Sequence, residues 1–395
     1  MKKVGRILVV FCMLIAIYVT TMCISYMIPN DYIKEIVGIS VSRLNGEGDY
    51  YNPLFETDAS KLDNFTDRLM ISKAIKNDDK GALYNSLDVN DYARYWHGYL
   101  VLIRPLLIKL DYLQIRYVNV LIFFVLLGIT FTMIKKKLGG LMASAFMVSI
   151  MMGYAFLVPL SLQFSSVFYI MMISIMFILF LHNRRALYDK LIYIFFIIGS
   201  ITNFFDLLTA PLLTLGVPLI IVLLLKINDK EDDSFIKNLF TAVFNSIMWA
   251  IGYGVTWFSK WVIASIVLKK NVIVDAINNI LFRTNGNEEY PVDLAAMFRS
   301  NIDLMYNDMI KKVLLIVLVI WIVLFIFYRK RWDKVFKLVA ILSVAVLPYI
   351  WYFVLSNHSQ IHCFFTYRIQ IMTTFSVFAF MIMTIDFEKI KNKVL

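Results

Sequence analysis

Residues 313–327 have the sequence VLLIVLVIWIVLFIF, which contains no charged side chain. A helix that crosses a bilayer needs about 20 predominantly apolar residues, and this run supplies most of one. A membrane β-strand instead alternates apolar and polar residues over about 10 positions. The uninterrupted run therefore predicts a transmembrane helix and excludes a porin-type barrel.

The composition of the whole chain agrees with this run. Hydrophobic residues make up 60% of the 395 residues, and charged residues make up 17%. Soluble globular proteins have about 45–50% apolar and about 25% charged residues. A soluble enzyme and a disordered protein are therefore excluded. Only three Cys occur, and two of them lie in the first apolar stretch, so no disulfide framework is expected.

Ten apolar stretches predict an all-α polytopic protein whose residues 1–395 form a single membrane domain. The first stretch follows MKKVGR and has no small-residue cleavage site, so we expect an uncleaved span and not a signal peptide. The ten predicted spans are residues 7–28, 117–134, 139–159, 165–181, 190–205, 208–226, 239–258, 312–328, 335–355 and 369–385.

The positive charge predicts orientation and not nucleic-acid binding. The formal net charge is +11, but the basic residues gather at the ends of the spans. Lys and Arg in short loops are enriched on the cytoplasmic side of a membrane. With the N-terminus inside, 20 of the 39 basic residues, Lys230 among them, lie in cytoplasmic segments, and only Arg368 lies in a short outer loop. We expect a multi-pass protein of the cell membrane, of the bacterial cytoplasmic type, with both termini in the cytoplasm.

Two long extracytoplasmic segments are predicted, at residues 29–116 and 260–311. The first contains LDNFTDRLMISKAI at residues 62–75, which predicts a helix capped by Asp63 or Thr66 with Asp67 in its first turn. The second predicts one or two short amphipathic helices around the turn TNGNEEYP, forming a lid in which Arg283 could contact an acceptor.

Aromatic and basic residues alternate in DYARYWHGYLVLIRPLLIKLDYLQIRYVN, residues 91–119. Such residues anchor helices at the depth of the lipid headgroups. We therefore expect residues 92–112 to form a juxtamembrane helix on the outer surface, broken near Pro105.

A first span, a long outer loop with an acidic residue opening a helix, an aromatic-rich juxtamembrane segment and a second span follow one another over residues 1–135. This order resembles the C-type polytopic glycosyltransferases, although Asp67-Arg68 stands where a paired acidic motif would be expected. The resemblance implies a polyprenyl-phosphate sugar donor, reaction at the extracytoplasmic face, and an acidic residue of the first outer loop as catalytic base.

Two acidic residues are the predicted catalytic groups. Asp67 matches the position of the base in the resembled family, but it could also be a helix-capping or solvated residue. Asp206 is the only charged residue between Leu191 and Leu225. An ionisable group so close to the membrane is costly and indicates function, although a helix cap next to Pro211 is the alternative.

The last short outer loop, NHSQIHCFFTYR at residues 357–368, collects polar side chains. We predict that His358, His362, Tyr367 and Arg368 bind the phosphate of a lipid-linked donor, because a cation in this loop runs against the charge pattern. The alternative is an interfacial Arg that reaches the headgroups. The two His are spaced i, i+4, but without the Glu of the zinc-protease pattern no metal site is predicted.

Further residues complete the predicted site. Lys260, Arg94 and Arg104 are candidate phosphate ligands, with membrane-interface anchoring as the alternative. Asp49 and Gln163 are candidate acceptor ligands. No cofactor is assigned, and a divalent cation, Mg²⁺ or Mn²⁺, is left open.

These features predict a glycosyltransferase that moves a sugar from a polyprenyl-phosphate donor to a cell-surface glycan or lipid acceptor. Its other partners are the bilayer and, as an open alternative, an enzyme that makes the donor. A transporter or flippase of a lipid-linked saccharide, or a surface polysaccharide polymerase or ligase, remain alternative functions. A transporter places its ionisable residues near the midplane in broken helices, whereas the candidates here gather on one side. No Walker-type motif occurs, so no ATP-driven pump is expected.

Overall fold

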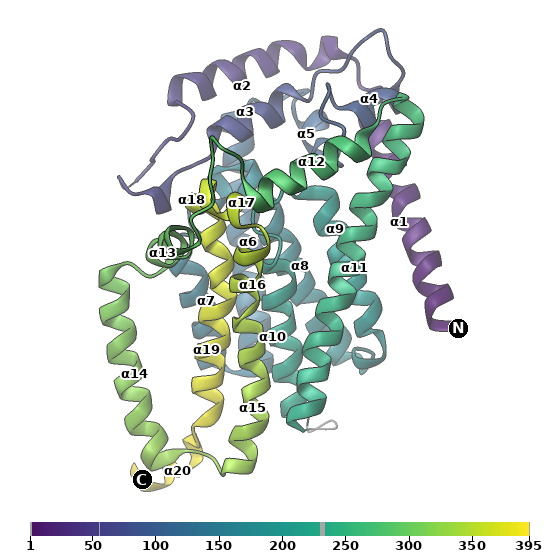
Figure 1. The fold of residues 1–395 in the computed structure, drawn as a ribbon. Helices are drawn as coiled ribbons and strands as arrows, with labels where there is room; N and C mark the ends of the chain where they lie inside the picture. The colour runs from purple at the N-terminus through teal and green to yellow at the C-terminus, as the bar shows by residue number, and fades with distance from the viewer. Residues whose placement is uncertain (1, 55, 230–233, 395) are drawn as a thin grey trace.

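The computed structural model describes residues 2–54, 56–229 and 234–394. These residues form helices and no strand, with two isolated β-bridges at Gly286–Pro291 and Arg329–Ile385 (Figure 1). The predicted all-α class is therefore confirmed for the part of the chain that is described.

Eight helical segments within the described residues are long and apolar enough to cross a membrane, which indicates a multi-pass membrane protein. They are α1 (Lys2–Met27), α6 (Tyr112–Leu138), α8 (Leu162–Asn183), α9 (Leu191–Phe205) with the turn before it, α11 (Phe235–Leu268), α14 (Asp308–Tyr328), α15 (Trp332–Ala345) with α16 (Leu347–Val354), and α18 (Cys363–Thr366) with α19 (Ile371–Thr384).

The other two predicted spans are shorter helices, α7 (Gly140–Met152) and α10 (Leu213–Asn228). At 1.5 Å per residue, α7 is about 20 Å long and α10 about 24 Å, less than the roughly 30 Å of a hydrocarbon core. Every residue of α10 from Leu213 to Leu225 is buried, against α8, α11, α15 and α19. Its apolar composition therefore reflects burial in protein and not exposure to lipid.

Short helices cover one end of the bundle, at the top of Figure 1. We call this the capped end, formed by residues 29–111, 269–307 and 355–370. Its helices are α2 (Lys34–Glu47), α3 (Asn64–Ser72), α4 (Ala82–Asp88), α5 (Leu100–Leu106), α12 (Val272–Asn285), α13 (Leu294–Met305), α17 (Ser356–Ile361) and α18. The last helix, α20 (Phe387–Val394), lies at the opposite end.

Most of both predicted outer segments, residues 29–116 and 260–311, lies in the capped end. The differences are at their ends, because α6 begins at Tyr112 and α11 continues to Leu268. Asp63 caps α3 by accepting a hydrogen bond from the Thr66 N–H at 2.9 Å. Of the two predicted caps, Asp63 and Thr66, the structure therefore has Asp63. In the second segment α12 and α13 flank a turn closed by the Gly286–Pro291 bridge, as expected.

The predicted interfacial helix over residues 92–112 is wrong in extent and position. Only α5 is helical there, and His97 adopts the left-handed conformation with φ 55°. Gly98 lies so close to Phe204 that an added Cβ would be 2.6 Å from the Phe204 carbonyl oxygen. This contact draws the segment inward, so Trp96 and the tyrosines at 95 and 99 are core residues and not a belt at the membrane surface.

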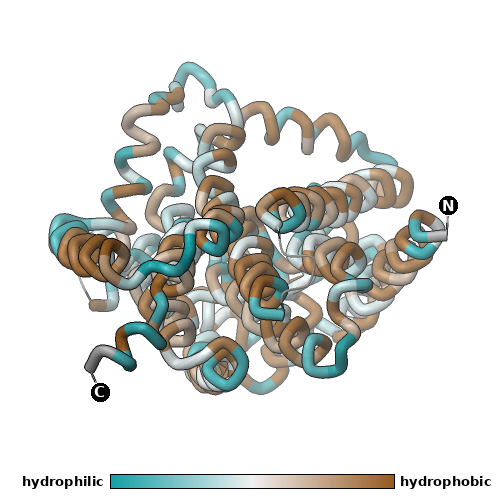
Figure 2. Tube along the Cα trace, turned by 90° about the horizontal axis from the view of Figure 1, so that it is seen from below, coloured by the Kyte–Doolittle hydropathy of each residue, from teal (hydrophilic) through white to brown (hydrophobic). Residues whose placement is uncertain are grey.

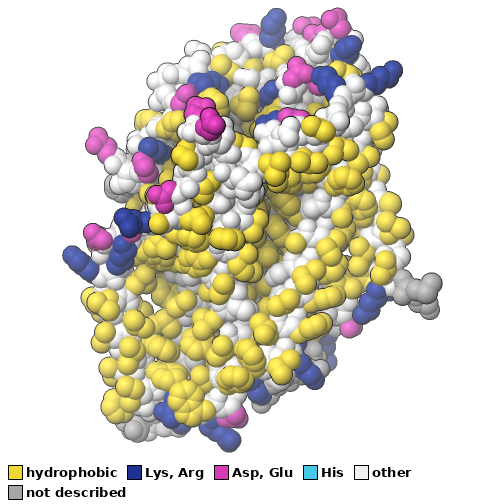
Figure 3. Space-filling model, in the orientation of Figure 1, with side chains coloured by type: hydrophobic (Ala, Val, Ile, Leu, Met, Phe, Trp, Pro, Cys, Tyr) yellow, Lys and Arg dark blue, Asp and Glu magenta, His cyan; other side chains and the backbone are white. Residues whose placement is uncertain are grey.

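The surface outside the cap is apolar. Figure 3 shows a broad band of hydrophobic side chains between charged groups at the two ends. Helix α14 has no buried residue, so its whole circumference suits contact with lipid. Seen from the end opposite to the cap, the trace shows short hydrophilic segments between hydrophobic helices (Figure 2). Lys230 lies outside the described residues.

Candidate functional site

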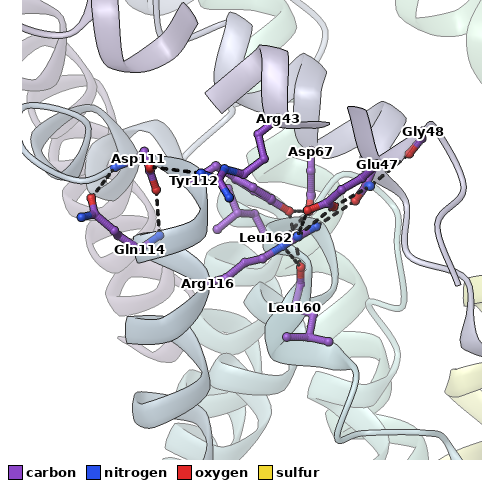
Figure 4. A network of polar contacts seen from close by, with 11 residues as sticks. Arg43, Glu47, Gly48, Asp67, Asp111, Tyr112, Gln114, Arg116, Leu160 and Leu162 are labelled. Carbon is purple, nitrogen blue, oxygen red and sulfur yellow. Dashed lines mark hydrogen bonds and ion pairs between the residues drawn. The ribbon is translucent and has the colours of Figure 1, made fainter. Parts of the chain in front are cut away.

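Asp67, a predicted catalytic base, is fully buried at the N-terminus of α8. Its carboxylate accepts hydrogen bonds from the Leu162 N–H at 3.0 Å, the Gln163 N–H at 2.9 Å and the Ser161 hydroxyl at 3.2 Å. Tyr112 of α6 donates a fourth (Figure 4). An ionised carboxylate has about four acceptor sites, so these donors leave none for a substrate.

This geometry gives Asp67 a structural role in place of the predicted catalytic one. A negative charge at a helix N-terminus is stabilised by the unpaired N–H groups and the helix dipole. Burial raises the pKa of Asp67, and the hydrogen bond from Tyr112 acts in the opposite direction. The carboxylate therefore joins α3 to the start of α8.

A second group of polar contacts, made by Arg116, lies beside Asp67 (Figure 4). Arg116 of α6 donates to both carboxylate oxygens of Glu47, at 2.7 and 2.8 Å. The same guanidinium donates to the Leu160 carbonyl at 2.8 Å and to the Asn64 side-chain oxygen at 3.0 Å. The two groups of contacts together hold α2 and α3 of the cap against α6 and α8.

The two predicted acceptor ligands differ in accessibility. Asp49 lies on the surface of the cap, where its carboxylate pairs with Arg68 at 2.7 Å. Gln163 is 5% exposed, and within the described residues its side-chain oxygen has no hydrogen-bond partner. Acceptor binding by either residue stays a prediction.

Arg368, the predicted phosphate ligand, is 1% exposed and is held by backbone carbonyls. It donates to Gly153 at 3.1 Å, to Phe364 at 3.0 Å and to Ala59 at 3.2 Å. The Tyr367 hydroxyl donates to the same Ala59 carbonyl at 2.9 Å. Both side chains therefore hold the loop around Ala59 against the bundle, and their predicted contact with phosphate stays a prediction.

Lys260 and Arg104 are also fully buried. The Lys260 ammonium donates to the Leu87 carbonyl at 2.7 Å. Arg104 donates to the carbonyls of Ser25 at 3.0 Å and Ile28 at 2.6 Å, at the end of α1. These cations donate to carbonyl groups in the interior and are not anchors at the membrane surface, while one buried Arg104 nitrogen has no partner within the described residues and phosphate binding stays a prediction for both.

Asp206 has a different environment. It follows the last residue of α9, is 2% exposed, and accepts a hydrogen bond from the Thr209 N–H at 3.0 Å. In the turn that this bond closes, Leu208 has φ 68°, a strained conformation for a leucine. Burial raises the pKa of Asp206 to about 7, against the opposing effect of the Thr209 hydrogen bonds. A carboxyl group that titrates near neutral pH can accept or deliver a proton.

His358 connects the turn of Asp206 to helix α12. Its Nδ1 contacts a guanidinium nitrogen of Arg283, which can only donate. The opposite ring nitrogen, Nε2, therefore carries the proton and donates to the Leu208 carbonyl at 2.8 Å. Burial and the charge of Arg283 keep the pKa of His358 well below its usual value. The ring of His362 lies 4.8 Å away, and burial lowers its pKa to about 3, so both imidazoles are neutral at pH 7.

Two tyrosines and a second arginine complete this arrangement. Burial raises the pKa of Tyr95, and Arg283, Arg94 and Asp206 are close enough to affect its titration. Tyr253 of α11 is likewise within electrostatic range of Asp206, Tyr95 and Arg283. We call the six residues Asp206, Tyr95, Tyr253, Arg94, Arg283 and His358 the Asp206 cluster.

Both arginines of the cluster keep a donor without a partner. Arg94 pairs with Asp275 of α12 at 3.3 Å and lies over the Tyr92 ring, 4.4 Å from its centroid. Within the described residues, the buried Nε–H groups of Arg94 and Arg283 have no hydrogen-bond partner. An unpaired buried donor is costly, and the Arg94 guanidinium also lies 5.9 Å from the centroid of the Tyr95 ring.

The cluster draws on segments far apart in the sequence. Asp206 and His358 were expected in the site, and they are joined through Leu208. Arg283 had been predicted only as an acceptor contact, and Tyr253 had no signal because it lies in the apolar pattern of a span. No three His, Cys, Asp or Glu side chains are grouped for a metal ion within the described residues.

Comparisons with protein-family models, with curated proteins and with solved structures gave no match to this chain.

Proposed function

We propose that the protein is an integral membrane glycosyltransferase that moves a sugar from a polyprenyl-phosphate donor to a hydroxyl group of a cell-surface glycan or lipid. In this proposal all ten apolar helices lie in a bacterial cytoplasmic membrane, both termini are cytoplasmic, and the capped end faces outward. The site is the Asp206 cluster.

The observation that carries the proposal is a buried carboxyl group whose pKa is about 7, in a turn that His358 joins to Arg283, which keeps an unpaired buried donor. Sugar transfer needs a base for the acceptor hydroxyl and cations for the departing phosphate. Asp206 takes the hydroxyl proton while the acceptor oxygen bonds to the anomeric carbon. The bond from that carbon to the phosphate oxygen breaks, and the polyprenyl phosphate leaves with both electrons, stabilised by Arg283 and Arg94.

The position of the cluster favours transfer over transport. Asp206 and His358 lie outside the eight segments that can cross a membrane, and Arg283 and Arg94 belong to the cap. A transporter or flippase would place such groups near the bilayer midplane. In this proposal Asp206 and the arginines act on a lipid phosphate at the outer surface of the membrane.

The test is a transfer assay with the purified full chain in liposomes. A panel of undecaprenyl-phosphate hexoses is supplied with a membrane extract that provides acceptors, and released undecaprenyl phosphate is measured by mass spectrometry. We expect release by the wild-type protein and a loss of at least about 100-fold in Asp206→Asn, the usual lower range for removal of a general base.

Asp303→Asn is the matched control, because Asp303 lies on α13 in the same cap and is half exposed, paired with Lys311 at 2.7 Å. It should retain the wild-type rate. Equal rates in Asp206→Asn and the wild type would overturn the assignment of Asp206, and no release from any donor of the panel would overturn the proposed donor class.

A further inference from the structure

A groove of about 790 Å³ opens between α1, α8 and α9, at the end of the bundle opposite to the cap. Most of the groove wall is apolar and includes Val9 of α1, Phe177 of α8 and Ile197 of α9. The groove therefore offers space for hydrocarbon.

Polar groups lie together in the lining of this groove. Arg6 of α1 and Lys190, just before α9, contribute two cations, and Asp189 contributes one anion. Lys190 and Tyr193 are three residues apart and so lie on the same helix face. The groove thus combines an apolar wall with a net positive polar region, as an anionic amphiphile requires.

Two further observations show that these polar groups are not used within the protein. The Tyr193 hydroxyl is buried and has no hydrogen-bond partner within the described residues. The side chains of Arg6 and Lys190 are exposed, and neither forms a hydrogen bond or an ion pair within the described residues. A buried hydroxyl without an acceptor is costly, and a phosphate oxygen would supply that acceptor.

We propose that this groove binds an anionic phospholipid from the leaflet in which Arg6 and Lys190 lie. Its phosphodiester is bound by the two cations and accepts a hydrogen bond from Tyr193. Its acyl chains lie along Val9, Phe177 and Ile197. This lipid site is separate from the Asp206 cluster, which lies at the capped end, and does not depend on the proposed sugar transfer.

The test is a lipid titration of the purified full chain in detergent, followed by native mass spectrometry. The probes are a phosphatidylglycerol and a phosphatidylcholine with the same acyl chains. We expect tighter binding of phosphatidylglycerol. The double variant Arg6→Gln, Lys190→Gln should weaken that binding about 30-fold, at the usual contribution of a basic residue near an anionic headgroup.

Two other variants make the test specific. Lys135→Gln, Lys136→Gln removes the same charge from the end of α6, outside the groove, and should bind phosphatidylglycerol as the wild type does. Val9→Trp fills the apolar part without changing any charge and should also weaken binding. The proposal is overturned if both lipids bind equally, if the two double variants behave alike, or if Val9→Trp has no effect.

Discussion

Replacing Asp206 by Asn tests its buried environment without any substrate. The pKa of Asp206 is raised from 3.8 to about 7, because burial disfavours the ionised form. The unfolded chain therefore releases this proton near pH 4, whereas the folded protein releases it near pH 7. Between pH 4 and pH 7 only the unfolded chain loses this proton, so the free energy of unfolding falls progressively over that range.

The magnitude follows from the shift of about three units at 1.4 kcal/mol per unit. The raised pKa of Asp206 therefore lowers the free energy of unfolding by about 4 kcal/mol above pH 7 and by about 2 kcal/mol at pH 5. Asn keeps an oxygen that can accept the Thr209 N–H hydrogen bond and carries no charge. Any cost of placing its amide nitrogen is the same at both pH values, so the difference between pH 8 and pH 5 isolates ionisation.

The assay is denaturant unfolding of the purified protein in detergent at pH 5 and pH 8. We expect the stability of Asp206→Asn relative to wild type to increase by about 2–3 kcal/mol from pH 5 to pH 8. Asp303→Asn should show no such increase, because Asp303 is half exposed. An equal effect of Asp206→Asn at the two pH values would refute the reasoning.

Three other substitutions test the structural roles. Asp67→Ala leaves the buried N–H groups at the start of α8 without their acceptor and should cost about 3 kcal/mol in denaturant unfolding, whereas a cost below 1 kcal/mol would contradict its structural role. Gly98→Ala should destabilise by about 1–3 kcal/mol in the same measurement, since its Cβ would overlap Phe204, and a neutral effect would disprove the close contact. Arg368→Gln should lower the free energy of unfolding by about 3 kcal/mol, since it removes donors to three buried carbonyls. In the folded fraction of this variant, the KM for the lipid donor should stay unchanged. A large rise in KM there would restore Arg368 as a phosphate ligand.

Hydropathy could predict the helices but not their surroundings. The apolar runs of α14 and α10 look alike in sequence, yet α14 has no buried residue and α10 is buried from Leu213 to Leu225. Lipid and protein interior select the same side chains, so a hydropathy pattern does not distinguish them. For this reason two of the ten predicted spans became shorter helices.

The site was predictable only where one residue broke a local pattern. Asp206 stood out as the single charge in a long apolar region, and it is the centre of the cluster. Arg368 stood out in the same way, but its donors are used by the carbonyls of Ala59, Gly153 and Phe364. Which carbonyls lack a helical partner depends on tertiary structure, so the sequence does not separate a structural arginine from a binding one.

The pH dependence of sugar transfer tests the central claim most directly, because it reports the ionisation of the base itself. With the donor that supports release of undecaprenyl phosphate, kcat/KM of the wild type should rise with pH through an apparent pKa near 7, as Asp206 ionises. Asp206→Asn should be slow at every pH and lack this rise. A wild-type rate that is constant from pH 5.5 to pH 8.5, on the scale set by a pKa of about 7, would contradict the account.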